Sequence, residues 1–122
     1  ISNFIAQALR NEPLTIYGDG SQTRSFCYVN DLIDGMICLM DSEYKMPLNI
    51  GNPDEYTILE IAKIIQKKIN PNLYLCFKPL PPDDPVRRLP DISVAKKELN
   101  WEPRTTLNEG IESTIKWFKD EF

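Results

Sequence analysis

The residues best suited to bind a small anionic ligand lie in a loop that starts at Tyr17. The segment Tyr17-Gly18-Asp19-Gly20-Ser21-Gln22-Thr23-Arg24 combines an aromatic face, two glycines and the hydrogen-bond donors of Gln22 and Arg24. Glycine lets the backbone approach a ligand closely and adopts positive φ at little cost. The structural alternative is a turn between two strands, in which Arg24 is an ordinary solvated charge.

The spacing Gly18-x-Gly20 does not make this loop a dinucleotide-binding fingerprint. Position 23 is Thr instead of Gly, and the loop leads into a second β-rich run. A dinucleotide fingerprint opens a helix, because the amides of the helix N-terminus hold the pyrophosphate. The sequence therefore predicts no cofactor site at these glycines.

A second candidate lies in the stretch 79–92, where five prolines prevent a regular element. It contains Asp83-Asp84-Pro85-Val86-Arg87-Arg88-Leu89-Pro90-Asp91. The planar guanidinium of Arg88 suits a phosphate, with Asp91 setting the loop. If Arg24 and Arg88 converge, they would clamp a pyrophosphate. The alternatives are a solvated proline-rich loop, or a magnesium site at the two adjacent carboxylates.

A third match, Tyr74-x-x-x-Lys78, has the spacing of the catalytic pair of short-chain dehydrogenases. That pair needs a helix, where i and i+4 side chains are about 5–6 Å apart. Residues 73–78 alternate like a strand, which would separate the two side chains by roughly 13 Å at ~3.3 Å per residue. The match is therefore interpreted as chance.

Composition excludes several classes of function. The 122 residues carry a net charge of -4 and no basic block, which argues against nucleic acid and anionic membrane as partners. The absence of histidine excludes a Ser-His-Asp mechanism. Three scattered cysteines without a Cys-x-x-Cys pair indicate a reducing compartment and no zinc site. No apolar run reaches the ~20 residues that span a bilayer.

Helices and strands alternate along the chain, which predicts one small α/β layer without an internal domain boundary. Asn30 and two capping boxes, Thr57 with Glu60 and Thr106 with Glu109, are expected to open helices. Helices are predicted at 2–11, 30–40, 57–69, 93–99 and 106–118, and strands at 14–17, 25–29, 47–50 and 73–78. Trp101 is expected to plug the core. The chain opens at Ile1 in helical spacing and without Met, which indicates a piece of something longer.

Three segments in order resemble the C-terminal third of the extended short-chain dehydrogenase/reductases that act on nucleotide sugars. They are 17–26 with the following Tyr28-Val29 and Asp31-Leu32, then Leu48-Asn49-Ile50-Gly51-Asn52-Pro53, and 83–92 through Leu99-Asn100-Trp101-Glu102-Pro103. The likeness covers essentially the whole chain, and within the family it is nearest to the UDP-glucuronate decarboxylases.

The resemblance implies the small C-terminal substrate-binding lobe of an NAD(P)-binding Rossmann-fold enzyme, with residues 1–122 as one nucleotide-sugar-binding lobe. NAD and the catalytic Tyr-Lys pair would belong to the missing N-terminal lobe, so this chain alone would be inert. In the decarboxylases, NAD oxidises C4 of UDP-glucuronate, carbon dioxide is lost, and UDP-xylose forms. The parent would be a cytoplasmic homodimer, or membrane-anchored in a secretory compartment of a eukaryote, with a UDP-sugar as its ligand. The face meeting the NAD lobe would be an exposed apolar patch.

The resemblance also assigns roles to individual residues, none of them catalytic and none a metal ligand. The uracil pocket would be lined by Thr15, Ile16 and Tyr17. The pyrophosphate would be bound by Arg24 and Arg88, with Gln22 and Phe26 close by. A single carboxylate, that of Asp91, would hold the loop or a ribose hydroxyl. Two positions depart from the pattern, since Asn100 stands for Gly and Leu89 for Lys.

Four hypotheses remain open at this point. The first is the substrate lobe of a UDP-glucuronate decarboxylase. The second is the same lobe of a dTDP-glucose 4,6-dehydratase or a UDP-sugar 4-epimerase. The others are a freestanding, non-catalytic nucleotide-sugar-binding module and a purely structural α/β adaptor.

Overall fold

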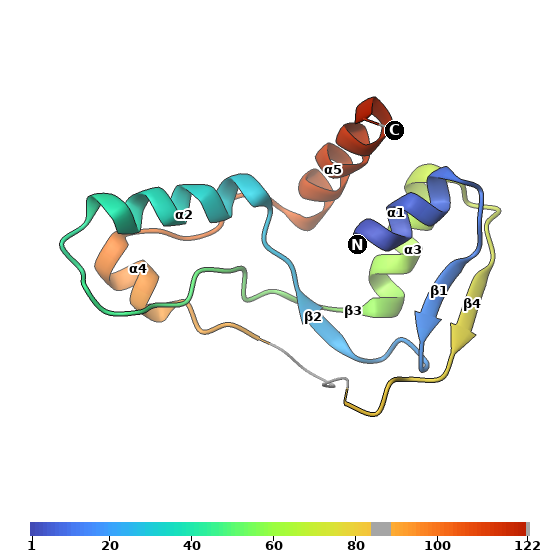
Figure 1. The fold of residues 1–122 in the computed structure, drawn as a ribbon, viewed down its shortest axis with the longest axis horizontal. Helices are drawn as coiled ribbons and strands as arrows, with labels where there is room; N and C mark the ends of the chain where they lie inside the picture. The colour runs from blue at the N-terminus through green and yellow to red at the C-terminus, as the bar shows by residue number, and fades with distance from the viewer. Residues whose placement is uncertain (84–88, 122) are drawn as a thin grey trace. The chain divides into compact units, whose positions relative to one another are not determined.

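The computed structural model describes residues 1–83 and 89–121, and in this part of the chain helices alternate with short strands (Figure 1). The α/β class predicted from the sequence is confirmed. The elements are α1 Ser2–Leu9, β1 Leu14–Tyr17, β2 Thr23–Ser25, α2 Val29–Asp41, β3 Glu55–Thr57, α3 Ile58–Ile69, β4 Leu75–Lys78, α4 Ser93–Leu99 and α5 Leu107–Glu121.

The chain divides into two compact units. The first unit comprises Ile1–Arg24, Tyr56–Arg87 and Ile111–Phe122, and the second comprises Ser25–Glu55 and Arg88–Gly110. The prediction that 1–122 works as one nucleotide-sugar-binding lobe concerns how the two units act together, and it stays a prediction.

The first unit is built on a parallel pair of strands, β1 and β4. Leu14 lies opposite Leu75, and Tyr17 lies opposite Lys78. Helices α1 and α3 pack on each other and on β1. Because side chains alternate along a strand, Leu14 and Ile16 both point into this core and are fully buried. The other buried apolar residues here are Phe4, Ile5, Ala8, Ile61, Ala62, Ile65, Leu73, Ile111 and Ile115.

The second unit packs α2 against α4 around Trp101. Trp101 is 6% exposed, and its indole Nε1 donates to the carbonyl of Asp31 at 3.1 Å. This confirms the prediction that Trp101 is a core residue. Ile92 and Ala95 complete the buried cluster, and half-buried apolar residues surround it: Cys27, Cys38, Leu48, Ile50 and Leu99.

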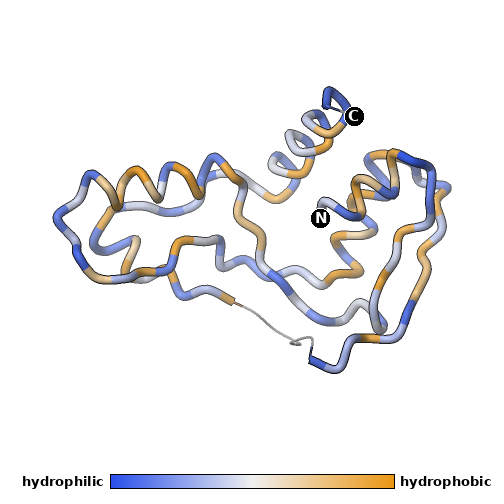
Figure 2. Tube along the Cα trace, in the orientation of Figure 1, coloured by the Kyte–Doolittle hydropathy of each residue, from blue (hydrophilic) through white to orange (hydrophobic). Residues whose placement is uncertain are grey.

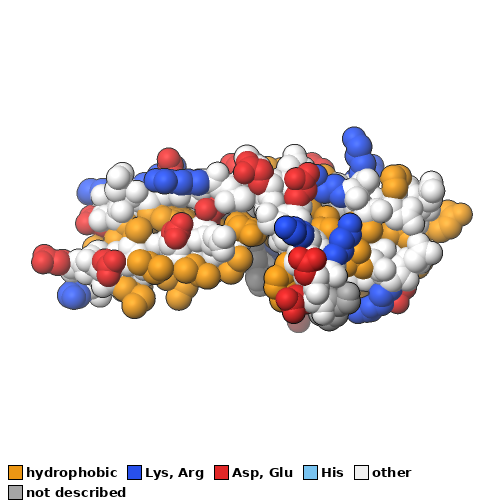
Figure 3. Space-filling view, turned by 90° about the horizontal axis from the view of Figure 1, so that it is seen from above, with side chains coloured by type: hydrophobic (Ala, Val, Ile, Leu, Met, Phe, Trp, Pro, Cys, Tyr) orange, Lys and Arg blue, Asp and Glu red, His pale blue; other side chains and the backbone are white. Residues whose placement is uncertain are grey.

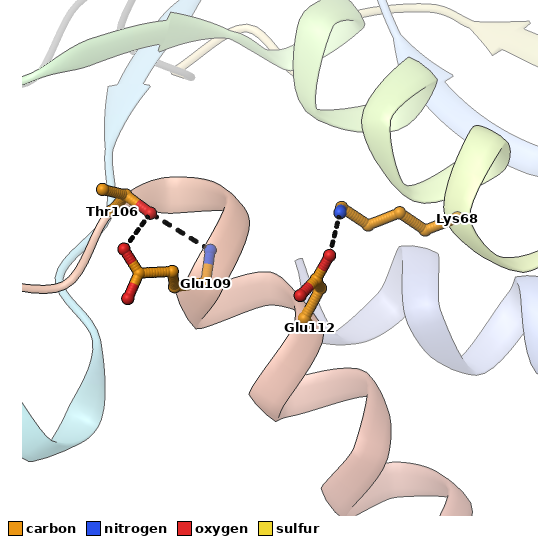
Figure 4. A network of polar contacts seen from close by, with 4 residues as sticks. All are labelled: Lys68, Thr106, Glu109 and Glu112. Carbon is orange, nitrogen blue, oxygen red and sulfur yellow. Dashed lines mark hydrogen bonds and ion pairs between the residues drawn. The ribbon is translucent and has the colours of Figure 1, made fainter.

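Both predicted capping boxes open helices. The hydroxyl of Thr57 accepts the amide of Glu60 at 3.0 Å, at the start of α3. At the start of α5, the hydroxyl of Thr106 accepts the amide of Glu109 and donates to its carboxylate (Figure 4). Farther along α5, Glu112 pairs with Lys68 of α3 at 2.8 Å.

Three of the predicted elements are corrected by the structure. β2 ends at Ser25 and α2 starts at Val29, so the predicted strand 25–29 is wrong. The residue before α2 is Tyr28, which makes no side-chain cap, so Asn30 is not the cap either. No strand forms at 47–50; β2 instead pairs with β3, which was not predicted.

Figure 2 shows hydrophobic stretches recurring along α2, as expected of an amphipathic helix. No helix within the described residues is long and apolar enough to cross a membrane.

Candidate functional site

The loop after β1 is held in one shape by its own backbone and side chains. Gly18 and Gly20 have φ values of 69° and 78°, the positive region that the sequence predicted for them. The amide of Gly18 donates to the carbonyl of Lys78 at 2.7 Å, and the side chain of Gln22 donates to the carbonyl of Tyr17 at 3.0 Å. These bonds fix both ends of the loop.

The same loop closes the N-terminus of α3. The amides of Ile58 and Leu59 donate to the carbonyls of Gln22 and Gly20, each at 3.0 Å. A Cβ at Gly20 would lie 2.9 Å from the Cβ of Leu59, so this approach requires glycine. The hydroxyl of Thr57 accepts the next amide, that of Glu60. Three of the four backbone amides that lack a partner within the helix at its N-terminus are therefore hydrogen-bonded inside the protein. The amides of Ile58, Leu59 and Glu60 are therefore not free to bind a phosphate.

The edge of β1 that faces away from β4 is only partly closed. In a parallel pair, the backbone N–H and C=O groups of alternate residues bond to the partner strand. The backbone groups of Leu14, Ile16 and Gly18 therefore face β4, while those of Thr15 and Tyr17 face away from it. The side chain of Gln7 accepts the amide of Thr15 at 3.1 Å and donates to its hydroxyl at 3.0 Å.

On that same outward edge, the carbonyl of Tyr17 accepts the hydrogen bond from the side-chain amide of Gln22. Among the described residues, the carbonyl of Thr15 and the amide of Tyr17 then have no hydrogen-bond partner within the protein. They form an adjacent acceptor and donor, which is the pattern that the N–H and C=O edge of a pyrimidine base requires.

The eight residues predicted to bind substrate differ in what their side chains can reach. Ile16 is fully buried and Gln22 is 7% exposed, so both shape the loop, and Ile16 could offer a ligand only main-chain groups. Tyr17 is 47% exposed. Arg24, in β2, is half-buried and donates from Nη1 to the carbonyl of Thr23 at 2.7 Å. Phe26, also half-buried, lies in the second unit.

Asp91 lies just before α4 in the second unit. Its carboxylate accepts the amide of Ser93 at 3.0 Å, and its carbonyl accepts the side-chain amide of Asn49 at 3.4 Å. The hydrogen bonds from Ser93 lower the pKa of Asp91 below its ordinary value, although the carboxyl group is exposed. A Cβ at Gly51 would lie 3.1 Å from Pro90, so this end of the loop is packed closely against 49–51.

Arg88 and Asp84 fall outside the described residues, so convergence of Arg88 with Arg24 stays a prediction. Two surface hollows, of about 350 and 260 Å³, lie in the described surface. Neither is lined by any of the eight predicted residues. Within 1–83 and 89–121, no group of three or more acidic or cysteine side chains is arranged to hold a metal ion.

Two residues that organise these regions were not predicted from the sequence. Gln7 was assigned only to a helix, yet it closes part of the β1 edge. Asp31 is buried, and its Oδ2 accepts the amides of Arg104 and Thr105 at 3.2 and 2.9 Å. One signal was present: Asp31, Gly35 and Cys38 fall on one face of α2 at i, i+4 and i+7, where small side chains allow close packing.

With this geometry established, comparison with known proteins defines the class. The family model described as GDP-mannose 4,6 dehydratase matches residues 1–114. The chain belongs to this family of extended short-chain dehydrogenase/reductases, which confirms the resemblance drawn from its motifs.

The chain is similar to individual proteins of known name over nearly its whole length. The chain is 52% identical over 119 residues to UDP-glucuronic acid decarboxylase 2 of Arabidopsis thaliana, covering 98% of this chain and 27% of the relative. It is 50% identical over 121 residues to UDP-glucuronic acid decarboxylase 1 of Danio rerio, covering 99% and 29%. The chain thus spans less than a third of the length of these relatives.

A solved structure shows the same fold. UDP-glucuronic acid 4-epimerase from Bacillus cereus, in complex with UDP-glucuronic acid and NAD, superposes with a TM-score of 0.90 at 31% identity. The match covers 98% of this chain and 39% of the epimerase. The predicted fold class, a lobe of a Rossmann-type short-chain dehydrogenase/reductase, is confirmed by this likeness.

Proposed function

We propose that this chain is the nucleotide-sugar-binding part of an NAD-dependent UDP-glucuronate decarboxylase, a carbon–carbon lyase that forms UDP-xylose and carbon dioxide. The observation that carries the proposal is identity near 50% to UDP-glucuronic acid decarboxylases over nearly the whole chain. The corresponding lobe of a 4-epimerase is the second candidate, because the epimerase structure shares the fold at 31% identity.

The outward edge of β1 would receive the uracil. Its N3–H would donate to the carbonyl of Thr15, and a ring carbonyl would accept the amide of Tyr17. The support is that these two groups lack a partner within the described residues, while Gln7 and Gln22 occupy their neighbours. The exposed ring of Tyr17 would cover the base, and Ile16 would support the strand from below.

The pyrophosphate would be bound by Arg24 and Arg88, with Gln22 holding the loop and Phe26 nearby. Asp91 would fix the end of the Arg88 loop through its bond to Ser93. The amides at the start of α3 are already used by the 20–22 loop, so this helix end would not hold the pyrophosphate of NAD. The part of the longer protein outside this chain would hold NAD, which supplies the oxidation and reduction at C4, and this chain alone would be inert.

The longer protein would be a homodimer, as in the family that the motifs resemble. A reducing compartment such as the cytoplasm fits the three cysteines, which are all unpaired and lie within the described residues.

A binding experiment tests the proposed ligand site. In the full-length protein, Arg24→Ala and Arg88→Ala are each expected to weaken binding of UDP by roughly 1.5–3 kcal/mol, the scale of a hydrogen bond to a charged group. Arg10→Ala is the matched control, because among the described residues the exposed side chain of Arg10 makes only a long ion pair, with Glu12 at 3.9 Å. Titration calorimetry measures the three affinities. Unchanged binding of UDP in both site variants would rule out pyrophosphate binding by Arg24 and Arg88.

A further inference from the structure

The outward edge of β1 is closed at both ends by glutamine side chains. At one end, the side chain of Gln7 in α1 accepts the amide of Thr15 at 3.1 Å and donates to its hydroxyl at 3.0 Å. At the other end, the side chain of Gln22 donates to the carbonyl of Tyr17 at 3.0 Å. Among the described residues, the two glutamines leave one acceptor, the carbonyl of Thr15, followed by one donor, the amide of Tyr17.

A strand edge without this closure offers more than one place to a base. The N–H and C=O of every second residue point to the same side, so donors and acceptors alternate along the edge. A ligand that moves from the Thr15 carbonyl and Tyr17 amide to the two backbone groups of Thr15 shifts by about 3.3 Å, half of the two-residue repeat. Uracil fits both pairs, because its N3–H donor lies between two ring carbonyls.

The charged side chains of the surface do not choose between these two positions. Figure 3 shows Lys, Arg, Asp and Glu side chains interspersed over the face that it displays. A uracil ring carries no charge, so such groups act on the phosphates and leave the place of the base open. The two hollows in the described surface do not choose either, because neither is lined by Thr15 or Tyr17. The choice depends on the hydrogen bonds along β1.

We infer that Gln7 is a positioning residue that fixes the register of the base. By binding the amide of Thr15, it leaves uracil one pair of backbone groups and excludes the neighbouring pair. This rests on the proposed function only in taking the outward edge of β1 as the base site. A base bound out of register would displace the attached sugar from the place where its C4 reacts. Turnover should suffer more than affinity, since a misplacement of about 1 Å can cost on the order of a hundredfold in rate.

Hydrogen exchange resolved to single amides reads this register without relying on turnover. The full-length protein is compared with and without UDP. In the unaltered protein, the Thr15 amide is expected to exchange slowly even without UDP, and UDP should slow the Tyr17 amide at least about tenfold. In Gln7→Met, the Thr15 amide should exchange fast without UDP and become slow with UDP, because the base then also occupies the neighbouring pair.

Two further variants of the same residue keep this test decisive. Gln7→Glu retains an acceptor for both the amide and the hydroxyl of Thr15, so it should restore the exchange pattern of the unaltered protein. Gln7→Ala removes the same hydrogen bonds without breaking the helix, and it takes the place of Gln7→Met if that variant does not fold.

Steady-state turnover of UDP-glucuronate gives a second readout. Gln7→Met is expected to lower kcat at least about tenfold while changing the affinity for UDP less than about threefold. Gln66→Met is the matched control, because half-buried Gln66 likewise donates from a helix, α3, to a backbone carbonyl, that of Leu73. In thermal unfolding it should cost a similar amount of stability, and it should leave kcat unchanged.

Three outcomes would overturn the inference: fast exchange of the Thr15 amide in the unaltered protein, UDP that binds Gln7→Met and leaves this amide fast, or an equal fall of kcat in Gln7→Met and Gln66→Met. The proposed function fails in a different way. The predicted exchange pattern in a protein that forms no UDP-xylose would remove the decarboxylase assignment alone. Formation of UDP-xylose by a protein whose Thr15 amide is unprotected would remove the role of Gln7 alone.

Discussion

The buried carboxylate of Asp31 is expected to hold the second unit together, and replacing it tests this directly. Its Oδ2 accepts the amides of Arg104 and Thr105, which lie more than seventy positions away in the sequence. A hydrogen bond to a charged group contributes about 1.5–3 kcal/mol, so the two bonds set an upper range of roughly 3–6 kcal/mol. Water can reach these part-buried amides in the variant, so we expect Asp31→Ala to cost about 3 kcal/mol.

The isosteric Asp31→Asn keeps one acceptor oxygen and loses the charge, so a smaller cost of about 1–1.5 kcal/mol is expected. Asp34→Ala, on the exposed arc of the same helix, should stay within about 0.5 kcal/mol of the unaltered protein. Urea unfolding of the full-length protein, followed by tryptophan fluorescence, measures all three. The reasoning is refuted if Asp31→Ala and Asp34→Ala unfold at the same urea concentration.

Two further predictions concern stability. Gly35→Ala should destabilise by about 1–2 kcal/mol, because overpacking against Ile50 and Trp101 outweighs the gain of up to ~1 kcal/mol in helix propensity. Gly110→Ala is its control in α5: its new Cβ would meet Tyr28 at an ordinary 3.4 Å, so thermal unfolding should show a gain instead. Hydrogen bonds from Ser93 hold the pKa of Asp91 below its ordinary 3.8. The stability that these bonds give is therefore complete above pH 3.8, and it is lost as the pH falls through the lower pKa that Asp91 has in the folded protein. Asp91→Asn should therefore flatten the loss of stability below about pH 4 in acid titrations, and an unchanged acid limb would contradict this.

The features that the sequence predicted well are those that depend on nearby residues. The boxes at Thr57 and Thr106 each act over three positions, and the glycines at 18 and 20 take the positive φ that a turn after a strand requires. Asn100 shows the same logic. It ends α4 in the left-handed region with φ 52°, which explains why a position that is usually Gly in the family accepts Asn, the next most tolerant residue.

The features that the sequence did not predict depend on partners far along the chain. The hydrogen bonds of Asp31 reach Arg104 and Thr105, so the residues around Asp31 in the sequence do not predict them. The pairing of β2 with β3 likewise joins segments some thirty residues apart. The segment 47–50 has the residues of a strand, but it pairs with no strand within 1–83 and 89–121. In the candidate site, the spacing of residues in the sequence likewise did not predict the hydrogen bonds that Gln7 and Gln22 make along β1.

Whether this chain binds the nucleotide sugar of a UDP-glucuronate decarboxylase can be tested through the reaction of the full-length protein. The most direct test is to incubate the full-length protein with UDP-glucuronate and NAD and identify the products by mass spectrometry, with Arg24→Ala alongside. Release of carbon dioxide and formation of UDP-xylose are expected, and both should be strongly reduced in the variant. A UDP-hexuronate epimerised at C4 without loss of carbon dioxide would contradict the claim and assign the chain to an epimerase.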